Sequence, residues 1–164
     1  MREAEQSSPR LIPTLARHVL LHADNIPDQM VSGSRRHIAV SVRNTSPIAW
    51  PACNKSGLTL GNRWLDESAR VIEWIDGRVP LPELKSGAEA RLRLPITAPR
   101  LTGAMQLILD VVEEGNSWFN LPQDAPLRAR VEIMHQEGNR GRRAILPIMK
   151  LWWKAHGPNG ASTP

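Results

Sequence analysis

The residues best suited to chemistry lie in the stretch LDVVEEGNSWFN, near the middle of the chain. An apolar run leads into Glu113 and Glu114, a Gly-Asn turn follows, and Trp118 stands beside Phe119, the only phenylalanine. Adjacent residues of a strand point to opposite faces of a sheet, so these two glutamates do not form a general acid and base pair. We interpret them as turn charges facing solvent. A pairing of Glu113 with a distant acid such as Asp66 stays open.

Metal and nucleophile chemistry find little support elsewhere in the chain. His18 and His22 lie four residues apart, but in the strand predicted there they would lie about 13 Å apart, with no third ligand nearby. Cys53 falls in a predicted loop without a histidine to activate it. The glycines of GNRGRR lack the Lys-Ser/Thr of a phosphate-binding loop. We therefore expect no cofactor and no enzyme, unless distant carboxylates converge in a cleft.

Four tryptophans offer a different chemistry, because each lies near the end of a predicted strand. Large side chains of this kind fill the space between two packed sheets, and we expect at least two of the four in the core. An exposed indole would instead stack on the apolar face of a sugar ring, with nearby polar groups bonding the hydroxyls. The four are Trp50, Trp64, Trp74 and Trp118, and the polar candidates are Arg63, Asp66, Arg78, Glu114, Asn116 and Ser117.

Short strands must position these residues. Residues 37–44 and 90–97 alternate apolar and polar side chains, which is typical of a half-buried strand. Turn residues separate about eight or nine such segments at roughly ten-residue spacing, and the Pro-rich VPLPEL fits an edge strand or a crossover. The sequence predicts an all-β fold, an antiparallel immunoglobulin-like β-sandwich of about eight strands.

Charge and composition divide the chain into three parts. We expect a flexible arm at residues 1–14, the β-sandwich at 15–136, and a basic linker, an apolar aromatic segment and a disordered end at 137–164. Of the formal net charge of +5, the last part carries five basic residues against one acid, which leaves +1 for the rest. A near-neutral folded part argues against a nucleic-acid partner. With a single cysteine and neither a signal peptide nor a membrane-spanning run, we expect a cytoplasmic protein.

About half the chain, residues 35 to 120, resembles a bacterial β-sandwich domain that accompanies many glycosyltransferases and methyltransferases of polysaccharide assembly. It is more loosely similar to the carbohydrate-binding C-terminal domain of Wzt, the nucleotide-binding subunit of O-antigen exporters. One departure is Met105, which stands where the family pattern has a tyrosine. The matching residues are Asn44, Ser46, Trp50, Pro51, Arg63, Trp64, Arg78, Leu81, Pro82, the turn Ser86-Gly87-Ala88-Glu89, Asp110, Val112, Glu114, Gly115, Trp118 and Phe119.

The resemblance implies a non-catalytic module of surface-polysaccharide (O-antigen or exopolysaccharide) biosynthesis or export. Its partner would be a bacterial polysaccharide or lipid-linked glycan, or a glycosyltransferase, methyltransferase or ABC transporter component to which it docks. In the motif itself we expect Trp118 to plug one end of the sandwich and Phe119 to lie on the other face. The candidate ligand contacts are Arg63, Trp64, Trp74, Arg78, Glu114, Asn116 and Trp118.

The segment AILPIMKLWWKAH near the C-terminus suggests a second contact. Its paired tryptophans and lysines suit an anionic membrane surface, which would make the protein peripheral at the inner membrane. A helix docked on a partner protein or a last strand on the sandwich are alternatives. The competing function is a protein-interaction adaptor without sugar binding, and an exposed tryptophan flanked by polar groups discriminates between the two. The tail contacts are Arg142, Arg143, Lys150, Trp152, Trp153 and Lys154.

Overall fold

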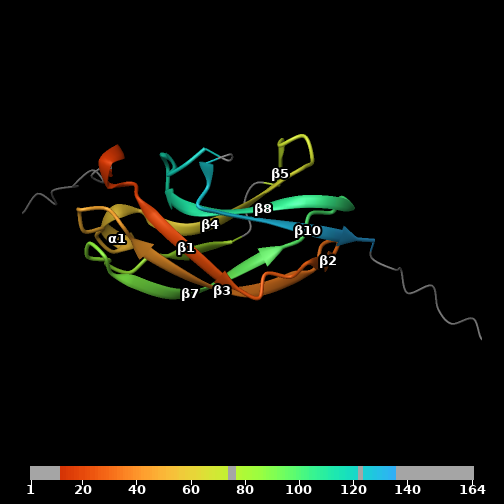
Figure 1. Cartoon of the computed structure of the whole chain (residues 1–164), viewed down its shortest axis with the longest axis horizontal. Helices are drawn as coiled ribbons and strands as arrows, with labels where there is room; N and C mark the ends of the chain where they lie inside the picture. Colours follow the sequence, from red (N-terminus) through yellow and green to blue (C-terminus); the bar gives the residue numbers. More distant parts are fainter. Residues whose placement is uncertain (1–11, 74–76, 122–123, 136–164) are drawn as a thin grey trace, which may run out of the picture.

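The computed structural model describes residues 12–73, 77–121 and 124–135. They form two packed β-sheets (Figure 1), an immunoglobulin-like sandwich that confirms the predicted all-β class. Ten strands are described, and four of them are pieces of two or three residues. The helical elements described are the 3-10 turn Thr14–Ala16 and the single turn α1, Cys53–Ser56. All six predicted tail contacts lie outside the described residues.

The smaller sheet has three antiparallel strands in the order β1-β3-β7. They span Val19–Asp24, Arg35–Asn44 and Glu89–Thr97. The alternation read in residues 37–44 is confirmed, because Ile38, Val40 and Val42 are buried while their neighbours are not. Their opposite face carries polar and charged side chains.

The larger sheet runs β2-β10-β8-β4-β5, with β6 paired to β4 and β9 paired to β8. Its pairs are antiparallel except β2 with β10. The Pro-rich segment contributes the short β6 beside β4, consistent with the edge position predicted from its prolines. The strands span Gln29–Val31 (β2), Leu58–Leu65 (β4), Val71–Glu73 (β5), Arg78–Pro80 (β6), Gly103–Glu113 (β8), Ser117–Trp118 (β9) and Leu127–Met134 (β10).

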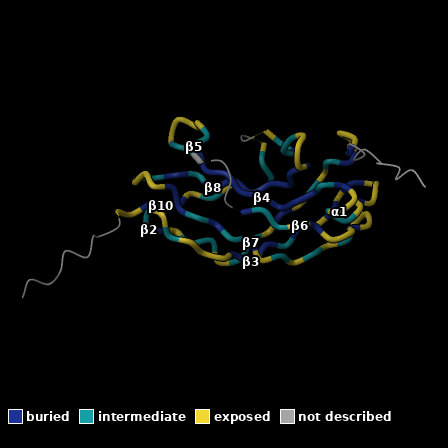
Figure 2. The backbone as a smooth tube through the Cα atoms, turned by 180° about the vertical axis from the view of Figure 1, so that it is seen from behind, coloured by how far each residue is buried: buried dark blue, intermediate teal, exposed yellow. Residues whose placement is uncertain are grey.

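The core lies between the sheets, where buried stretches of the chain face one another (Figure 2). It includes two of the four tryptophans. Trp50 is fully buried, and its Nε1 donates a hydrogen bond to the Ala16 carbonyl at 2.8 Å. Trp64 is also buried. The predicted arm extends too far, since Ile12 packs into this core as well. Trp74 lies outside the described residues.

The predicted placement of the paired aromatics is wrong, because the two residues exchange roles. Phe119 is 8% exposed and meets the Trp50 ring edge-on, with ring centroids 5.4 Å apart. Trp118 is only partly buried and stands opposite Val112 of β8, on the outer face of the large sheet. The reason is register: Phe119 pairs through its N–H with Val111, whose side chain points into the core.

Candidate functional site

Strand register gathers several predicted ligand residues on the outer face of the large sheet. Gly61 of β4 lies opposite Arg78 of β6 on one side and Asp110 of β8 on the other. Since side chains two residues apart on a strand share a face, Arg63 lies on this face with Gly61. Four of the predicted residues come together here, and we call Arg63, Arg78, Glu114 and Trp118 the Trp118 cluster.

Two guanidinium groups contact the indole of Trp118. The Cζ atom of Arg63 lies 4.3 Å from the ring centre and that of Arg78 lies 4.7 Å from it. Both distances are within the range of cation–π attraction, which is strongest for tryptophan. The indole is thus held by charged groups on a sheet rather than by the core.

Arg78 is positioned by hydrogen bonds and by a glycine. Its Nε lies 3.1 Å from Glu114 Oε1, which also accepts a hydrogen bond from the Thr59 hydroxyl at 2.7 Å. A Cβ atom on Gly61 would lie 2.3 Å from Arg78 Nη1. The guanidinium therefore lies directly over the β4 backbone, in space that only glycine leaves open.

Arg63 is 8% exposed and donates from Nη2 to the Asn120 carbonyl at 3.1 Å. The fully buried Asp110 binds the same Asn120, accepting from its backbone N–H at 2.7 Å and from its side-chain amide at 3.1 Å. Burial raises the pKa of Asp110, against the hydrogen bonds of Asn120 and the Arg63 charge. Burial likewise lowers the pKa of Arg63, and Asp110 opposes that shift.

Glu113 belongs to a different network, and the expectation that it faces solvent is wrong. It is 3% exposed and accepts from the Ile12 N–H at 2.8 Å, from Arg17 Nη2 at 2.9 Å and from the Asn116 amide at 2.7 Å. A pairing with Asp66 is excluded by topology. Glu113 lies opposite Leu58, the first residue of β4, whereas Asp66 follows the last residue of that strand.

One further predicted ligand contact is corrected by this arrangement. Trp64 is 1% exposed and packs in the core, so it offers no ring face to a ligand. The Asn116 amide is used to hold Glu113, which fastens the turn before Trp118. Asp66 closes the β4–β5 turn by accepting from the backbone N–H groups of Ser68 and Arg70.

Most other residues of the family resemblance serve the fold. The Asn44 amide donates to the carbonyls of Ile48 and Leu84, and its oxygen accepts from Ser46, which fixes the loop before Trp50. Leu81 is buried in the core. The Trp118 cluster differs from these residues, because its members lie on an outer sheet face.

The residues that support the cluster are not among those predicted from the sequence. Thr59, Gly61 and Asn120 hold Glu114, Arg78 and Arg63 respectively. A glycine inside a strand often indicates that another group approaches the backbone closely, so Gly61 could have been predicted to face such a group. Nothing local distinguishes Thr59 or Asn120.

Within residues 12–73, 77–121 and 124–135, no group of three or more metal-ligating side chains is placed to hold a metal ion. His22 lies 3.1 Å from Asp24 Oδ1, on the outer face of the small sheet. In the same part of the chain, no helix is long and apolar enough to cross a membrane.

Comparison with protein-family models finds no match, and neither does comparison with curated proteins. Solved structures share the architecture at low identity. A β-glucosidase from Listeria innocua is 13% identical over 73% of this chain, with a TM-score of 0.47, and this chain spans 16% of it. A CARDB domain from Pyrococcus furiosus in complex with di-metal ions is 14% identical over 71% of this chain, with a TM-score of 0.44, and the match covers 88% of that domain's chain. The Pseudomonas fluorescens DNA glycosylase AlkC is 12% identical over 71% of this chain, with a TM-score of 0.44, and the match covers 30% of AlkC. Likeness at this level carries no information about function.

Proposed function

We propose that this protein is a non-catalytic glycan-binding module and that the Trp118 cluster is its binding surface. The observation that carries the proposal is the partly exposed indole of Trp118, which contacts the guanidinium groups of Arg63 and Arg78. An exposed tryptophan flanked by polar groups is the feature that separates glycan binding from a purely adaptor role. An indole offers an apolar face to a sugar ring, and the polar groups around it bond the hydroxyls.

The rigidity of the cluster supports this use. Arg78 is held by Glu114, and Arg63 by the Asn120 carbonyl, so neither side chain has to be ordered when a ligand binds. A surface that is ordered beforehand loses less conformational entropy on binding. Glu114 is exposed and adds an acceptor beside the arginine donors. The surface thus offers both hydrogen-bond roles that a hydroxyl group requires.

The buried carboxylates are already used in structural hydrogen bonds, which supports a role without catalysis. Hydrolysis of a glycosidic bond commonly uses two carboxyl groups placed on either side of it. Asp110 and Glu113 instead use their oxygens to hold Asn120, Ile12 and Arg17. They stabilise the frame of the site.

The family resemblance of residues 35 to 120 supplies the biological setting of the proposal. On that basis the ligand is a bacterial surface polysaccharide or its lipid-linked form. The partners are the glycosyltransferase, methyltransferase or ABC transporter component that makes or moves it, and the place of action is the cytoplasmic side of the inner membrane.

The test is calorimetric titration of the full chain with oligosaccharides prepared from the surface polysaccharide of the bacterium that encodes it. We expect saturable binding that Trp118→Ala abolishes and that Leu20→Ala leaves unchanged. Leu20 is a suitable control because it is an exposed apolar residue of β1 in the other sheet. Absence of heat from every oligosaccharide would reject the proposal in favour of the protein-interaction adaptor.

A further inference from the structure

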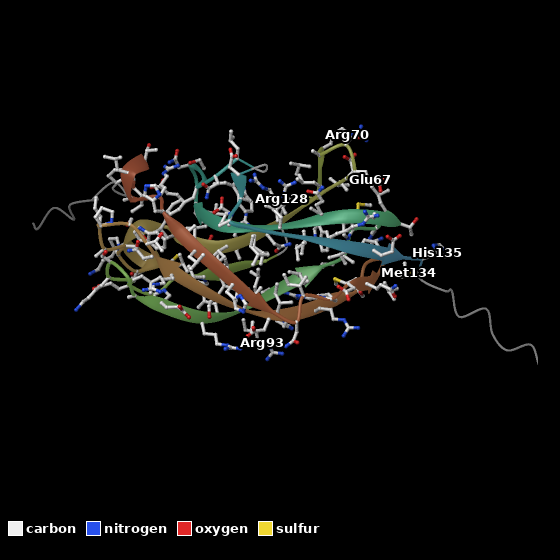
Figure 3. The ribbon with its side chains drawn as sticks, in the orientation of Figure 1. Glu67, Arg70, Arg93, Arg128, Met134 and His135 are labelled. Carbon is white, nitrogen blue, oxygen red and sulfur yellow. The ribbon has the colours of Figure 1, made fainter. Side chains whose placement is uncertain are left out.

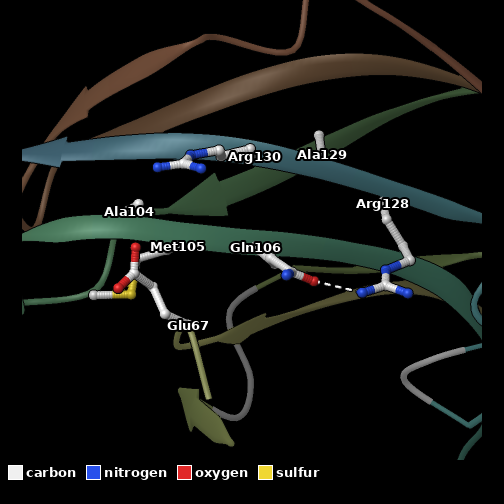
Figure 4. A pocket seen from close by; sticks show the side chains of 7 residues that line it. All are labelled: Glu67, Ala104, Met105, Gln106, Arg128, Ala129 and Arg130. Atoms are coloured by element: carbon white, nitrogen blue, oxygen red, sulfur yellow. Dashed lines mark hydrogen bonds between the residues drawn. The ribbon is translucent and has the colours of Figure 1, made fainter. Parts of the chain in front are cut away.

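A second feature lies on the same outer face, beyond the Trp118 cluster. It is a hollow of about 430 Å³ over strands β8 and β10, beside the β4–β5 turn (Figure 4). Ala104 and Gln106 of β8 line its floor, Arg128 and Arg130 line it from β10, and Glu67 lines it from the turn. The volume falls within the range of small-molecule sites.

The hollow is lined by more positive than negative charge. Arg128 and Arg130 are two residues apart on one strand, so both side chains leave the same face of the sheet. Arg128 donates from Nη2 to Gln106 Oε1 at 2.7 Å, which orients its guanidinium (Figure 4). Arg130 is exposed and has no hydrogen-bond or ion-pair partner in the part of the chain that the structure describes. Glu67 is the only acid among the described residues that line the hollow.

The hollow is close enough to the cluster for one ligand to reach both. Ile108 of β8 lies opposite Arg63 of β4 on one side and opposite Arg128 of β10 on the other. With neighbouring strands about 4.8 Å apart, the Cα atoms of the two arginines lie about 10 Å apart. Arg63 contacts the Trp118 ring and Arg128 lines the hollow.

The positively charged part of this surface, lined by Arg128 and Arg130, ends at the β4–β5 turn. A neighbouring hollow of about 370 Å³ is lined by Asp66, Glu67 and Ser68 of the turn and by Thr102, Gly103, Ala104 and Met105. An anionic group would be repelled there and attracted to the arginine side. The surface therefore has an indole at one end, a pair of arginines at the other, and an acidic boundary after them.

We propose that this hollow is a second subsite of the glycan-binding face and that it takes an anionic group of the glycan, a carboxylate or a phosphate, at Arg128 and Arg130. The inference rests on the proposed function, and it specifies the ligand class as an acidic oligosaccharide longer than one sugar. A guanidinium fork matches the oxygens of either anion, and such charge-assisted hydrogen bonds are stronger than neutral ones.

Titration of the full chain at low salt with three oligosaccharides of one backbone tests the proposal. The probes are an oligogalacturonate, its carboxyl-reduced form, and the reduced form carrying a phosphate ester. We expect at least one anionic probe to bind tighter than the neutral one, and the tighter of the two identifies the anion. Arg130→Gln should weaken that probe about three- to tenfold and leave the neutral probe unchanged. Arg93→Gln, the same change at an exposed arginine of the small sheet (Figure 3), should weaken neither.

The outcomes separate this inference from the proposed function. If all three probes bind equally, and Trp118→Ala still abolishes binding, the cluster binds glycan and the anionic subsite is rejected. The subsite is also rejected if Arg130→Gln and Arg93→Gln weaken the anionic probe equally, because the effect is then one of net charge. Failure of all three probes to bind rejects the anionic subsite, whereas the proposed function is rejected only if the host's own oligosaccharides also fail to bind.

Discussion

The guanidinium of Arg63 lies 4.3 Å from the centre of the Trp118 ring, although the arginine side chain is buried and bonded to the Asn120 carbonyl. A cation held by a backbone carbonyl has few other positions to adopt. The indole therefore packs against a charged group that keeps a fixed position. An arginine on an open surface would change its conformation instead. Trp118 is an ordered surface residue for this reason, and its removal should affect binding more than folding.

Substitution of the two adjacent aromatics should have very different effects on stability. Phe119→Ala should lower the free energy of unfolding by about 3–5 kcal/mol, because it leaves a cavity beside Trp50. Trp118→Ala should cost about 1–2 kcal/mol, since it removes two partly exposed cation–π contacts. Urea unfolding followed by circular dichroism measures both. Equal costs would mean that Trp118 also fills the core.

Gly61→Ala should dislodge Arg78 without deleting it. The new methyl group would lie 2.3 Å from Arg78 Nη1, and this guanidinium is the end of a flexible side chain that can move away. We expect a loss of about 1 kcal/mol in stability and a fall in glycan affinity equal to that of Arg78→Gln. Calorimetric titration of the two variants makes the comparison. Full affinity in Gly61→Ala would show that the position of Arg78 does not matter.

Gly77→Ala provides the contrast, because there the obstacle is backbone. A Cβ atom on Gly77 would lie 2.1 Å from the Pro95 carbonyl oxygen and 2.4 Å from Asn62 Oδ1. Its N–H also donates to that Asn62 oxygen. We expect a loss of about 3 kcal/mol or more. The two glycines should therefore differ by at least about 2 kcal/mol.

The fold could be predicted because its signal is local. Period-two alternation over residues 37–44 and 90–97 specifies which face of each strand is buried, and the structure follows it. The same rule also implies that Arg63 and Trp64, as neighbours on one strand, face opposite sides. The two residues therefore cannot both contact a ligand on one face, and the burial of Trp64 shows that its prediction is the wrong one.

The errors concern strand register and contacts between distant segments. The sequence predicts a solvated turn charge at Glu113, because its partners Ile12 and Arg17 precede it by 101 and 96 residues. The exchange of Trp118 and Phe119 depends on the register of β9 against β8 across a short turn, and a shift of one residue reverses the faces. The grouping of Arg63, Arg78 and Trp118 comes from three strands, which only the sheet order brings together.

Asp110 should make the protein respond to acid in an unusual direction. Burial raises the pKa of this carboxyl in the native state above 3.8, so the folded protein binds its proton more readily than the unfolded chain does. The stabilisation from protonation is complete below pH 3.8 and is lost as the pH rises through the native pKa. The free energy of unfolding of the natural protein should therefore fall relative to that of Asp110→Asn over this interval.

Carbon-detected NMR titration of the aspartates and urea unfolding at several pH values test this behaviour together. Asp66 serves as the internal reference, since hydrogen bonds from Arg70 and Ser68 lower the pKa of its carboxyl. The native pKa of Asp110 should lie above the ordinary aspartate value, and that of Asp66 should lie below it. A parallel pH dependence in the natural protein and Asp110→Asn would contradict the assignment.

The adjacent glutamates provide the sharpest internal comparison in the molecule. Glu113→Gln should lower the free energy of unfolding by about 2–3 kcal/mol, because the new amide NH₂ would meet donors from Arg17 and Asn116 in a buried site. Glu114→Gln should cost less than about 1 kcal/mol, since its pair with Arg78 is half exposed. The binding effects should be reversed, with Glu114→Gln weakening glycan affinity and Glu113→Gln leaving it intact in the folded fraction. Denaturant unfolding and calorimetry on the two variants decide the matter, and a matching loss of stability in both would place the two carboxylates in one network.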